Sequence, residues 1–545
     1  MLDCLIIVER GVSEPDLVKT LLARGFRDYF GHAREHLATD EAGRRLFAAE
    51  GNRSLLADYG LATRISLTSV VLATELRDAG LSFEVLDDDD VAGLWRDTLL
   101  DRLGRCRMVA VSTTYTVRQS TILRLLRLLR EADPDIPILL GGQGLSAWRL
   151  HYEQAGELYE RLADADALFF GEAEGSFAEL VRRMTGGRTV TGIPGAVSLR
   201  PEDRGDRGAD PEPVEVEVDR VALPDWRVLH DHDFNDGAVR RHGLPRVAAL
   251  EEGRGCTFRC KFCSYPLYAG FRRKSPERVV AELRGVTAAG FATASFCGAE
   301  FLSPVDKSRL VFEGIAEARL PVEIWAYARL DLVSYKPWIA DLMDRANFRY
   351  IQFGMESGDR TVLRAMNKNY DPEKMAVGAR LLRERGVQVY ASVILGYPGE
   401  TRETIANTLG VLEECDFDHL ILHVLNVVPG SPLWHRRADH GLEVNGQGFW
   451  SHPTLSLREM PEIIRSTYVE ALRRTTSTIN NVAQNFTNRF FAGAPTPAEQ
   501  TAATRTLQEV IANEWTPAGP DPERRRALWE RLAGQVQRVP EDLVA

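Results

Sequence analysis

Three cysteines within eight residues constrain this chain more than any other feature. Cys256, Cys260 and Cys263 lie in the segment Gly-Cys-Thr-Phe-Arg-Cys-Lys-Phe-Cys. A short loop with this spacing can wrap around a four-iron, four-sulfur cubane and supply three thiolates, which leaves the fourth iron open to a substrate or cofactor. A zinc site prefers paired Cys-x-x-Cys knuckles and a fourth protein ligand, and a disulfide is a poor candidate in an intracellular chain with seven cysteines in 545 residues. The loop therefore predicts an iron–sulfur cluster.

The triad, with Phe262 before its last cysteine, resembles the Cys-x-x-x-Cys-x-aromatic-Cys signature of radical S-adenosylmethionine enzymes. The resemblance implies that the amine and carboxylate of S-adenosylmethionine chelate the open iron. It also implies that an electron from the reduced cluster cleaves the sulfonium to give a 5′-deoxyadenosyl radical. The predicted cofactors are thus a [4Fe-4S] cluster and S-adenosyl-L-methionine.

Repeated β/α units surround and follow the triad. Apolar runs alternate with helical segments from about residue 246, and they predict strands at 247–250, 292–296, 322–325, 350–353, 389–395 and 420–427. Ser275 and Asp371 each precede a proline, the arrangement of an N-cap before the first helical residue. Six strands suit the (β/α)6 partial TIM barrel of the family, in which ligands bind at the carboxyl ends of the strands.

Four segments just past these predicted strands are similar to segments that bind S-adenosylmethionine in the family. The resemblance makes Glu300, in Phe-Cys-Gly-Ala-Glu, a partner of the methionyl amine, and Arg329 a partner of the methionyl carboxylate. Gly-Met-Glu-Ser-Gly and Leu-Gly-Tyr-Pro-Gly-Glu follow the next two strands. The resemblance implies that Glu356 and Ser357 of the first segment hydrogen-bond S-adenosylmethionine. It implies that the backbone of the second segment, at Gly396 and Tyr397, lies along the adenine.

The first 199 residues predict a second α/β domain. Strand-like runs occur at 5–8, 83–86, 108–112, 138–140 and 167–170, with helical stretches such as 65–77 and 121–131 between them, the pattern of a doubly wound flavodoxin- or Rossmann-like sheet. No Gly-x-Gly-x-x-Gly follows the first strand and no Gly-x-x-x-x-Gly-Lys-Ser/Thr occurs, so the pattern gives no support to a nucleotide domain. Small and hydroxyl-bearing residues at the strand tips leave room for a ligand to approach the backbone.

This arrangement is similar to the cobalamin-binding radical S-adenosylmethionine family over roughly residues 1–440. The resemblance implies cobalamin, as methylcobalamin, in the N-terminal domain, although the Asp-x-His-x-x-Gly motif that supplies a lower axial histidine in many cobalamin proteins is absent after the first strand. The predicted domains are 1–199, a connector at 200–245, the partial barrel at 246–440 and a helical C-terminal region at 441–545. The candidate cobalamin contacts are Arg64, Ser112, Thr113, Tyr115, Gly141, Gly142, Gly171 and Glu172.

Composition limits the partners. The formal charge of −11 and the lack of a Lys/Arg-rich stripe argue against nucleic acid, and no apolar run approaches the length of a membrane span. No signal peptide precedes the first residues, so we expect a cytoplasmic enzyme. The resemblance implies a small-molecule substrate and a flavodoxin- or ferredoxin-type reductant.

The paired cofactors indicate the reaction. A deoxyadenosyl radical can abstract hydrogen from an unactivated carbon, and methylcobalamin can give the resulting radical a methyl group. The hypothesis is C-methylation of a natural-product precursor. A cobalamin-dependent rearrangement, ring contraction or cyclisation is the alternative within enzymes, and an iron–sulfur redox sensor or electron carrier is the alternative outside them.

Overall fold

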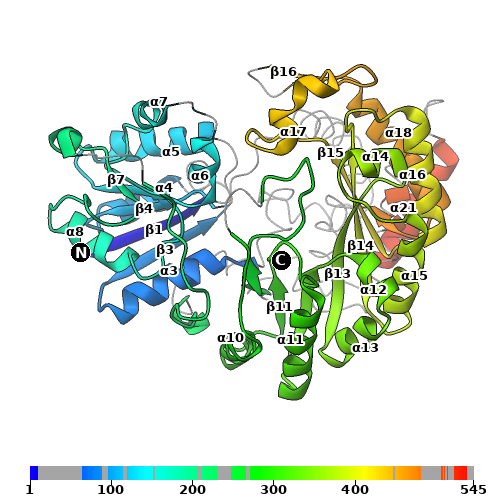
Figure 1. Cartoon of the computed structure of the whole chain (residues 1–545), viewed down its shortest axis with the longest axis horizontal. Helices are drawn as coiled ribbons and strands as arrows, with labels where there is room; N and C mark the ends of the chain where they lie inside the picture. Colours follow the sequence, from blue (N-terminus) through cyan, green and yellow to red (C-terminus); the bar gives the residue numbers. More distant parts are fainter. Residues whose placement is uncertain are drawn as a thin grey trace.

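The computed structural model contains two α/β units that lie side by side (Figure 1). The N-terminal unit is drawn in blue to cyan, and the unit that carries the cysteine triad is drawn in green to yellow. The structure describes residues 1–9, 64–88, 96–114, 119–150, 152, 154–206, 211–229, 247–265, 270–445, 449–479, a few positions between 502 and 513, and 521–536.

The N-terminal unit is built on a six-stranded sheet. All neighbouring strands are parallel except for the last, which runs antiparallel at the edge. In spatial order the strands are β3 (Phe83–Asp88), β1 (Cys4–Glu9), β4 (Val109–Ser112), β5 (Ile138–Gly141), β6 (Ala167–Phe169) and β7 (Ala196–Ser198). The five strands predicted for this region are confirmed, and β7 was not predicted.

Helices cover both faces of this sheet because alternate residues of a strand point to opposite sides. In β1, Ile6 and Val8 join one hydrophobic core, and Leu5 and Ile7 join another. The first core includes α3 (Leu67–Asp78) and α8 (Phe177–Thr185). The second core includes α4 (Arg96–Leu103), α5 (Gln119–Ala132), α6 (Gln143–Arg149) and α7 (Ala155–Arg161). The doubly wound fold is thereby confirmed.

The second unit contains an eight-stranded, wholly parallel sheet. The six predicted strands form its centre, which confirms the partial barrel. They are β8 (Val247–Leu250), β11 (Thr293–Phe296), β12 (Glu323–Tyr327), β13 (Phe348–Glu356), β14 (Gln388–Leu395) and β15 (His419–Val424). Two strands of two residues each extend the sheet, β2 (Arg64–Ile65) beside β8 and β18 (Thr478–Ile479) beside β15.

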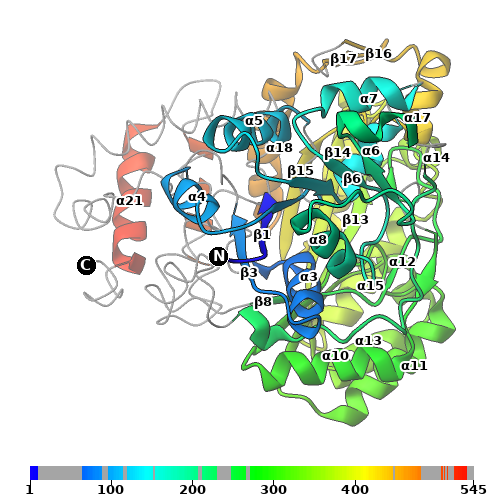
Figure 2. The ribbon, with the colours of Figure 1, turned by 90° about the vertical axis from the view of Figure 1, so that its left-hand side faces the viewer.

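Helices pack outside the barrel sheet, and Figure 2 shows α10, α11 and α13 together along one side of it. The barrel helices are α10 (Pro276–Ala288), α11 (Val305–Ala318), α12 (Leu330–Tyr335), α13 (Trp338–Arg345), α14 (Arg360–Ala365), α15 (Pro372–Arg383) and α16 (Arg402–Cys415). Ser275 caps α10 as predicted, since its hydroxyl accepts the Arg278 N–H at 3.2 Å. The predicted N-cap Asp371 precedes α15 but makes no capping hydrogen bond.

Shorter elements complete the fold. Two antiparallel hairpins are formed by β9 (Gly253–Arg254) with β10 (Arg272–Arg273) and by β16 (Glu443–Val444) with β17 (Trp450–Ser451). The remaining helices of the described residues are α17 (Pro432–His435), α18 (Met460–Arg474), α21 (Pro522–Val536) and the 3-10 turns Pro201–Asp206, Trp226–Leu229 and Arg437–His440.

The start of α3 differs from the sequence prediction. Arg64 was expected at the beginning of a helix, but it lies in β2 and pairs with Val247. The helix begins after Ser66, whose hydroxyl accepts the Ser69 N–H at 3.4 Å. The N-cap serine was the local signal for this boundary.

Two other segments also differ. The charged, Pro- and Gly-rich composition of residues 200–219 predicts a surface excursion, but Val214 forms a β-bridge with Gly171 and Val218 is buried, so part of this segment is built into the N-terminal unit. In the C-terminal region, the sequence pattern predicts helices over 461–486 and 497–515. The first ends at Arg474 and gives way to β18, and the second lies largely outside the described residues.

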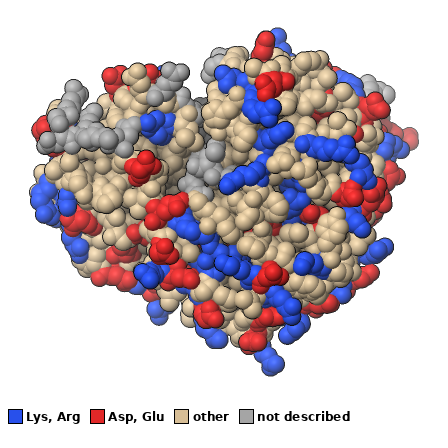
Figure 3. Space-filling view, viewed as in Figure 1, with Lys and Arg blue, Asp and Glu red and all other residues tan. Residues whose placement is uncertain are grey.

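The domain boundaries stay predictions, and β2 and β18 show that the barrel sheet draws strands from outside 246–440. Charged side chains of both signs are spread over the face seen in Figure 3. None of the described helices has the length and apolar character needed to cross a membrane.

Candidate active site

The cysteine loop begins directly after the β9 strand of the β9–β10 hairpin. Gly255 has φ of +74°, and a Cβ there would lie 2.6 Å from the carbonyl oxygen of Gly270. Only glycine tolerates both the backbone conformation and this close approach. The chain can therefore turn immediately before Cys256. All three cysteines of the triad are free thiols and partly exposed.

Backbone hydrogen bonds hold the loop against the barrel. The Lys261 N–H donates to the carbonyl of Met366 at 2.9 Å, and the Lys261 carbonyl accepts the Leu433 N–H at 2.7 Å. The Asn367 side chain donates to the carbonyl of Arg259 at 2.8 Å. These contacts do not involve the cysteine side chains, so the loop is positioned independently of any ligand.

The three thiols share one electrostatic environment. Burial raises the pKa of each thiol, that of Cys263 to about 11, and the positive charge of Lys368 opposes the rise in all three. Within the described residues no three His, Cys, Asp or Glu side chains form a group that could hold a single metal ion. Three thiols on one short loop are the donor set of a cluster with an open iron, so the residues present fit that group.

Two of the predicted S-adenosylmethionine residues meet beside the triad. Glu300 accepts the N–H groups of Leu302 at 2.9 Å and of Arg329 at 3.1 Å, and burial raises its pKa to about 7. The guanidinium of Arg329 binds both carboxylate oxygens of Asp331, at 3.0 and 2.9 Å. It also lies 4.3 Å from the ring centroid of Phe258 in the cysteine loop. Arg329 therefore connects the barrel to the loop.

Glu356 is the last residue of β13 and Ser357 follows it, and the two buried side chains have different partners. Glu356 has φ of +62° and pairs with Lys368 at 3.1 Å, and its charge acts on the thiol of Cys260. Ser357 is fully buried, and its hydroxyl accepts the Asp359 N–H at 3.1 Å. The structure thus places Glu356 near the triad and gives Ser357 a role in the turn after β13.

The segment at Gly396 and Tyr397 is covered by the C-terminal region. The Gly396 carbonyl accepts a hydrogen bond from Nε2 of His452 at 3.1 Å, and a Cβ at Gly396 would overlap the ring of Trp450. Tyr397 is fully buried, and its hydroxyl donates to the carbonyl of Ala365 at 3.1 Å. The backbone of this segment is therefore closely packed, and the side chain of Tyr397 is used within the fold.

A cavity of about 360 Å³ opens at the carboxyl ends of the N-terminal strands. This volume lies within the range of cofactor and ligand pockets. Its walls include five of the predicted cobalamin residues, which are Ser112, Gly141, Gly142, Gly171 and Glu172. The opposite wall comes from the half that carries the cysteines, with Glu251, Arg254, Tyr265 and Cys297. The cavity is thus shared between the two units.

Thr113, another predicted cobalamin residue, is not among the residues that line the cavity. Thr113 is fully buried, and its hydroxyl donates to the carbonyl of Gly141 and accepts the Leu145 N–H, both at 2.9 Å. Thr113 therefore stabilises the strand tips by linking the end of β5 to α6. Tyr115 and the side chain of Arg64 lie outside the described residues.

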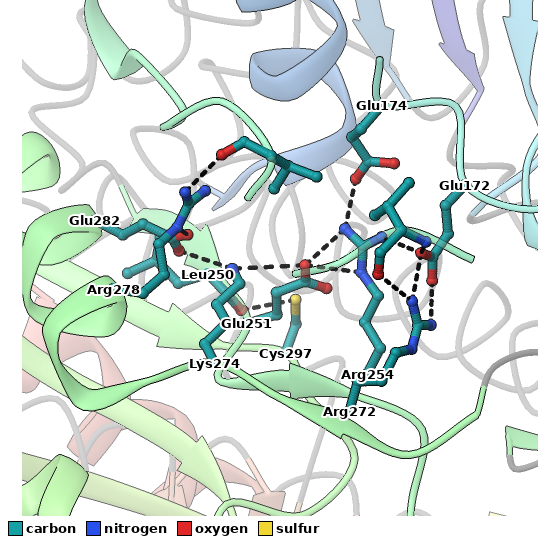
Figure 4. Close-up of polar contacts among 12 residues, drawn as sticks. Glu172, Glu174, Leu250, Glu251, Arg254, Arg272, Lys274, Arg278, Glu282 and Cys297 are labelled. Atoms are coloured by element: carbon teal, nitrogen blue, oxygen red, sulfur yellow. Dashed lines mark hydrogen bonds and ion pairs between the residues drawn. The ribbon is translucent and has the colours of Figure 1, made fainter. Parts of the chain in front are cut away.

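Charged side chains from both units form one wall of the cavity (Figure 4). Arg254 contacts Glu172 at 2.9 Å, Glu174 at 2.5 Å and Glu251 at 2.8 Å. Arg272 binds Glu172 at 2.6 Å. Burial opposes the ionisation of Glu172, but the hydrogen bonds and charges of the two arginines outweigh it and lower its pKa. This network joins the N-terminal strand tips to the hairpin that leads into the cysteine loop.

Comparison with known proteins identifies the cysteine-bearing half. Residues 251–412 match the family model described as the Radical SAM superfamily. These residues form a radical SAM domain. The match begins just before the β9–β10 hairpin and ends within α16, so it contains the triad and the four strand-end segments described above.

Relatives and solved structures extend the similarity beyond the radical SAM domain. The uncharacterized methyltransferase PH0819 of Pyrococcus horikoshii is 28% identical over 273 residues, 49% of this chain and 57% of the relative. The hopanoid C-2 methylase of Rhodopseudomonas palustris is 25% identical over 320 residues, 57% of this chain and 54% of the relative. The chain thus spans little more than half the length of these two curated relatives.

The fold extends the likeness to nearly the whole chain. The radical S-adenosylmethionine methyltransferase TsrM from Kitasatospora setae, solved with cobalamin and a [4Fe-4S] cluster bound, matches with a TM-score of 0.63 and 17% identity. The match covers 95% of this chain and 100% of TsrM. It confirms the predicted fold, that of a cobalamin-binding radical SAM enzyme.

Sequence reasoning missed two buried charged residues of the cysteine-bearing half, Lys368 and Glu252. Lys368 follows α14 in a segment without a recognisable pattern, and no local signal pointed to it. Glu252 lies two residues after β8, so its position near a strand end was a usable signal. It is buried, one of its oxygens has no hydrogen-bond partner among the described residues, and burial raises its pKa to about 7.

Glu400, at the end of the segment after β14, gives a pH-dependent prediction. Its carboxylate accepts the Gly396 N–H, and burial raises its pKa to about 8. The pKa of Glu400 is higher in the folded protein than in the unfolded chain. Its contribution to the stability of the folded protein is therefore greatest below about pH 4.5 and is lost as the pH rises to about 8. Glu400→Gln removes this titration. We expect the unfolding free energy of the variant, relative to wild type, to increase over this range by on the order of 1 to 4 kcal/mol.

Urea unfolding at several pH values between 5 and 8.5 measures this difference. Glu403→Gln, on the exposed face of α16, is the matched control and should show little change. A difference between wild type and Glu400→Gln that is independent of pH would contradict the prediction, because it would mean that Glu400 ionises normally in the folded protein.

Proposed function

We propose that this chain is a cobalamin-dependent radical S-adenosylmethionine C-methyltransferase that acts on a small-molecule precursor of a natural product. The observation that carries the proposal is the cavity between the N-terminal strand tips and the cysteine-bearing half. A methyl donor and a radical source must act on the same substrate carbon, and a shared cavity supports that geometry. The names of the two relatives and of TsrM, all methyltransferases or methylases, also support it.

In the proposed enzyme, Cys256, Cys260 and Cys263 hold the [4Fe-4S] cluster. Glu300 accepts the amine of S-adenosylmethionine, and Glu356 contributes a second carboxylate to the same side of the loop. The buried position of Glu300 beside the triad supports this role, since a carboxylate in a poorly solvated site gains most from a cationic partner. The backbone at Gly396 is the candidate for the adenine.

Cobalamin is proposed to bind in the cavity, against the backbone at Gly141, Gly142 and Gly171 and the hydroxyl of Ser112. When bound, the cofactors supply hydrogen abstraction and methyl transfer. The chain positions them: the ion pairs of Arg254 hold the two walls at a fixed separation, and the apolar residues Val71 and Leu72 of α3 limit the access of water. A flavodoxin- or ferredoxin-type protein is the proposed reductant.

The test does not require the natural substrate. The anaerobically reconstituted protein is given cobalamin, dithionite and S-adenosylmethionine labelled in its methyl group. We expect labelled methylcobalamin and S-adenosylhomocysteine, together with slow formation of 5′-deoxyadenosine. Deoxyadenosine without S-adenosylhomocysteine would support the rearrangement or cyclisation alternative instead. Neither product, with the cluster present, would favour the redox sensor or electron carrier.

Arg329 gives a prediction for cofactor affinity. Its guanidinium is the proposed partner of the methionyl carboxylate, and it is only slightly exposed because of Asp331 and Phe258. Loss of a charged hydrogen bond in such a site costs about 1.5 to 3 kcal/mol, so Arg329→Ala should weaken S-adenosylmethionine binding by roughly one to two decades. Equilibrium dialysis of reconstituted protein measures the affinity, and the visible spectrum reports the cluster.

Arg329→Lys separates charge from geometry, because lysine keeps the charge but cannot make the forked contact. We expect an intermediate affinity for it. Arg309→Ala, an exposed change on α11, is the control and should bind like wild type. Wild-type affinity of Arg329→Ala with an intact cluster would show that this arginine only supports the loop.

A further inference from the structure

Five basic residues lie on the cysteine loop and on two segments that contact it. Arg259 and Lys261 flank Cys260 in the sequence, and Arg364 lies on α14. Arg436 and Arg437 follow α17. Lys261 is half-buried and the four arginines are exposed. These five residues are called the basic patch below.

The fold gathers the patch from three segments. The hydrogen bond between the Lys261 carbonyl and the Leu433 N–H brings α17 to the loop, and the one between Asn367 and the Arg259 carbonyl brings the end of α14. Lys261 and Arg436 both act on the charge of His440, so they lie near the same group. Figure 3 shows Lys and Arg gathered on the upper part of the barrel half, in the region of α17 and α14.

Most of this positive charge is not neutralised within the chain. Arg436 pairs with Asp439 at 2.8 Å, but Arg259, Lys261, Arg364 and Arg437 form no ion pair with another described residue. Arg360, also on α14, shows the contrast, because it is paired with both Asp371 and Glu373. Unpaired positive charge is unexpected in a chain whose formal charge is −11.

We infer that the basic patch is the docking surface for an acidic one-electron carrier protein. This inference rests on the proposed function, because it requires a cluster on the cysteine loop. Electron transfer needs a short path, and Arg259 and Lys261 flank Cys260 while the other patch residues lie on segments hydrogen-bonded to the loop. Opposite charges guide such encounters and make their rate depend on salt. In the step, the reduced carrier loses one electron and the oxidised cluster gains it, and no bond or proton changes.

A nucleic acid is less favoured as the occupant. The patch contains five basic residues rather than a continuous stripe, and the chain as a whole is acidic. Complexes of electron-transfer proteins have small interfaces, so a patch of five charged residues is large enough to bind a small redox protein.

The experiment uses the holoprotein with Arg364→Glu and Arg437→Glu combined. Neither residue is a proposed ligand of the cluster or of S-adenosylmethionine. The control combines Arg309→Glu and Arg473→Glu, two exposed positions on α11 and α18 that give the same change in net charge. Stopped-flow absorbance follows reduction of the cluster by a photoreduced flavodoxin of strongly negative charge, at low and at high salt.

At low salt we expect the patch variant to be reduced by flavodoxin at least about ten times more slowly than wild type and the control, with a smaller difference at high salt. Dithionite and reduced methyl viologen, a small anion and a small cation, should reduce all three proteins at similar rates. Equal rates with flavodoxin for the patch variant and the control would overturn the inference. So would a loss of rate with all three reductants, or tRNA binding by wild type that the patch variant alone loses.

Failure of the proposed function gives a different result. If wild-type protein holds no reducible cluster, or if its reduced cluster does not cleave S-adenosylmethionine, the proposed function fails with dithionite as well. If only the docking inference is wrong, dithionite-reduced protein still cleaves S-adenosylmethionine.

Discussion

We expect replacement of Cys256, Cys260 and Cys263 together with Ala to remove iron binding and all turnover and to leave both units folded. The thiols are the donors that the proposed cluster needs. The loop itself is held by the backbone of Lys261 and Arg259 and by the contact between Phe258 and Arg329. Iron and sulfide assays after anaerobic reconstitution measure the loss, and circular dichroism checks the fold.

Cys297→Ala is the matched control. This cysteine lies on the cavity wall, and its thiol donates to the carbonyl of Leu250 at 3.0 Å. It follows β11 rather than lying on the cysteine loop, so the variant should keep about four irons per chain. Retention of about four irons by the triple variant would contradict the ligand assignment.

Strand prediction succeeded where burial imposes a pattern. Strands such as β4 and β8 are buried throughout, so they read as uninterrupted apolar runs. The strands β2 and β18 contain two residues each, too few for any periodic signal, and they exist only because a longer strand lies beside them. The helix predicted across 461–486 failed for the same reason, since β18 depends on its contact with β15.

The candidate site was predictable where residues follow strands in order. Glu300, Arg329 and Glu356 each come just after a predicted strand, and the ends of parallel strands meet at one edge of the sheet. In the structure, the charge of Glu300 acts on the thiol of Cys256, and the charges of Arg329 and Glu356 act on that of Cys260. Their role in binding S-adenosylmethionine stays a prediction.

The remaining contacts depend on pairings far apart in the sequence. Glu172 was predicted as a cobalamin contact, and it does line the cavity, but its carboxylate is held by Arg254 and Arg272 from the other unit. Ser357 and Tyr397 were predicted as ligand contacts, yet both are fully buried and hydrogen-bonded within the fold. No local pattern reports which of several polar residues at a strand end is used by the protein itself.

Filling the cavity between the units should strongly weaken cobalamin binding. Ser146 lies on α6, one turn after Gln143, and both line the cavity beside Gly142. In Ser146→Trp the indole occupies space that the corrin needs, so we expect cobalamin affinity to fall by at least about a hundredfold. The visible spectrum after incubation with hydroxocobalamin and desalting measures bound cobalamin.

Retention of the cluster shows whether Ser146→Trp affects only the cavity or the whole protein. None of the three triad cysteines lines the cavity, so Ser146→Trp should keep its iron and the cluster spectrum. Ser146→Ala, which enlarges the cavity slightly, should bind cobalamin like wild type. If Ser146→Trp retains cobalamin as tightly as Ser146→Ala, the corrin does not lie in this cavity. The proposal that the two units share one substrate site would then lose the observation that carries it, even with the cluster and S-adenosylmethionine in place.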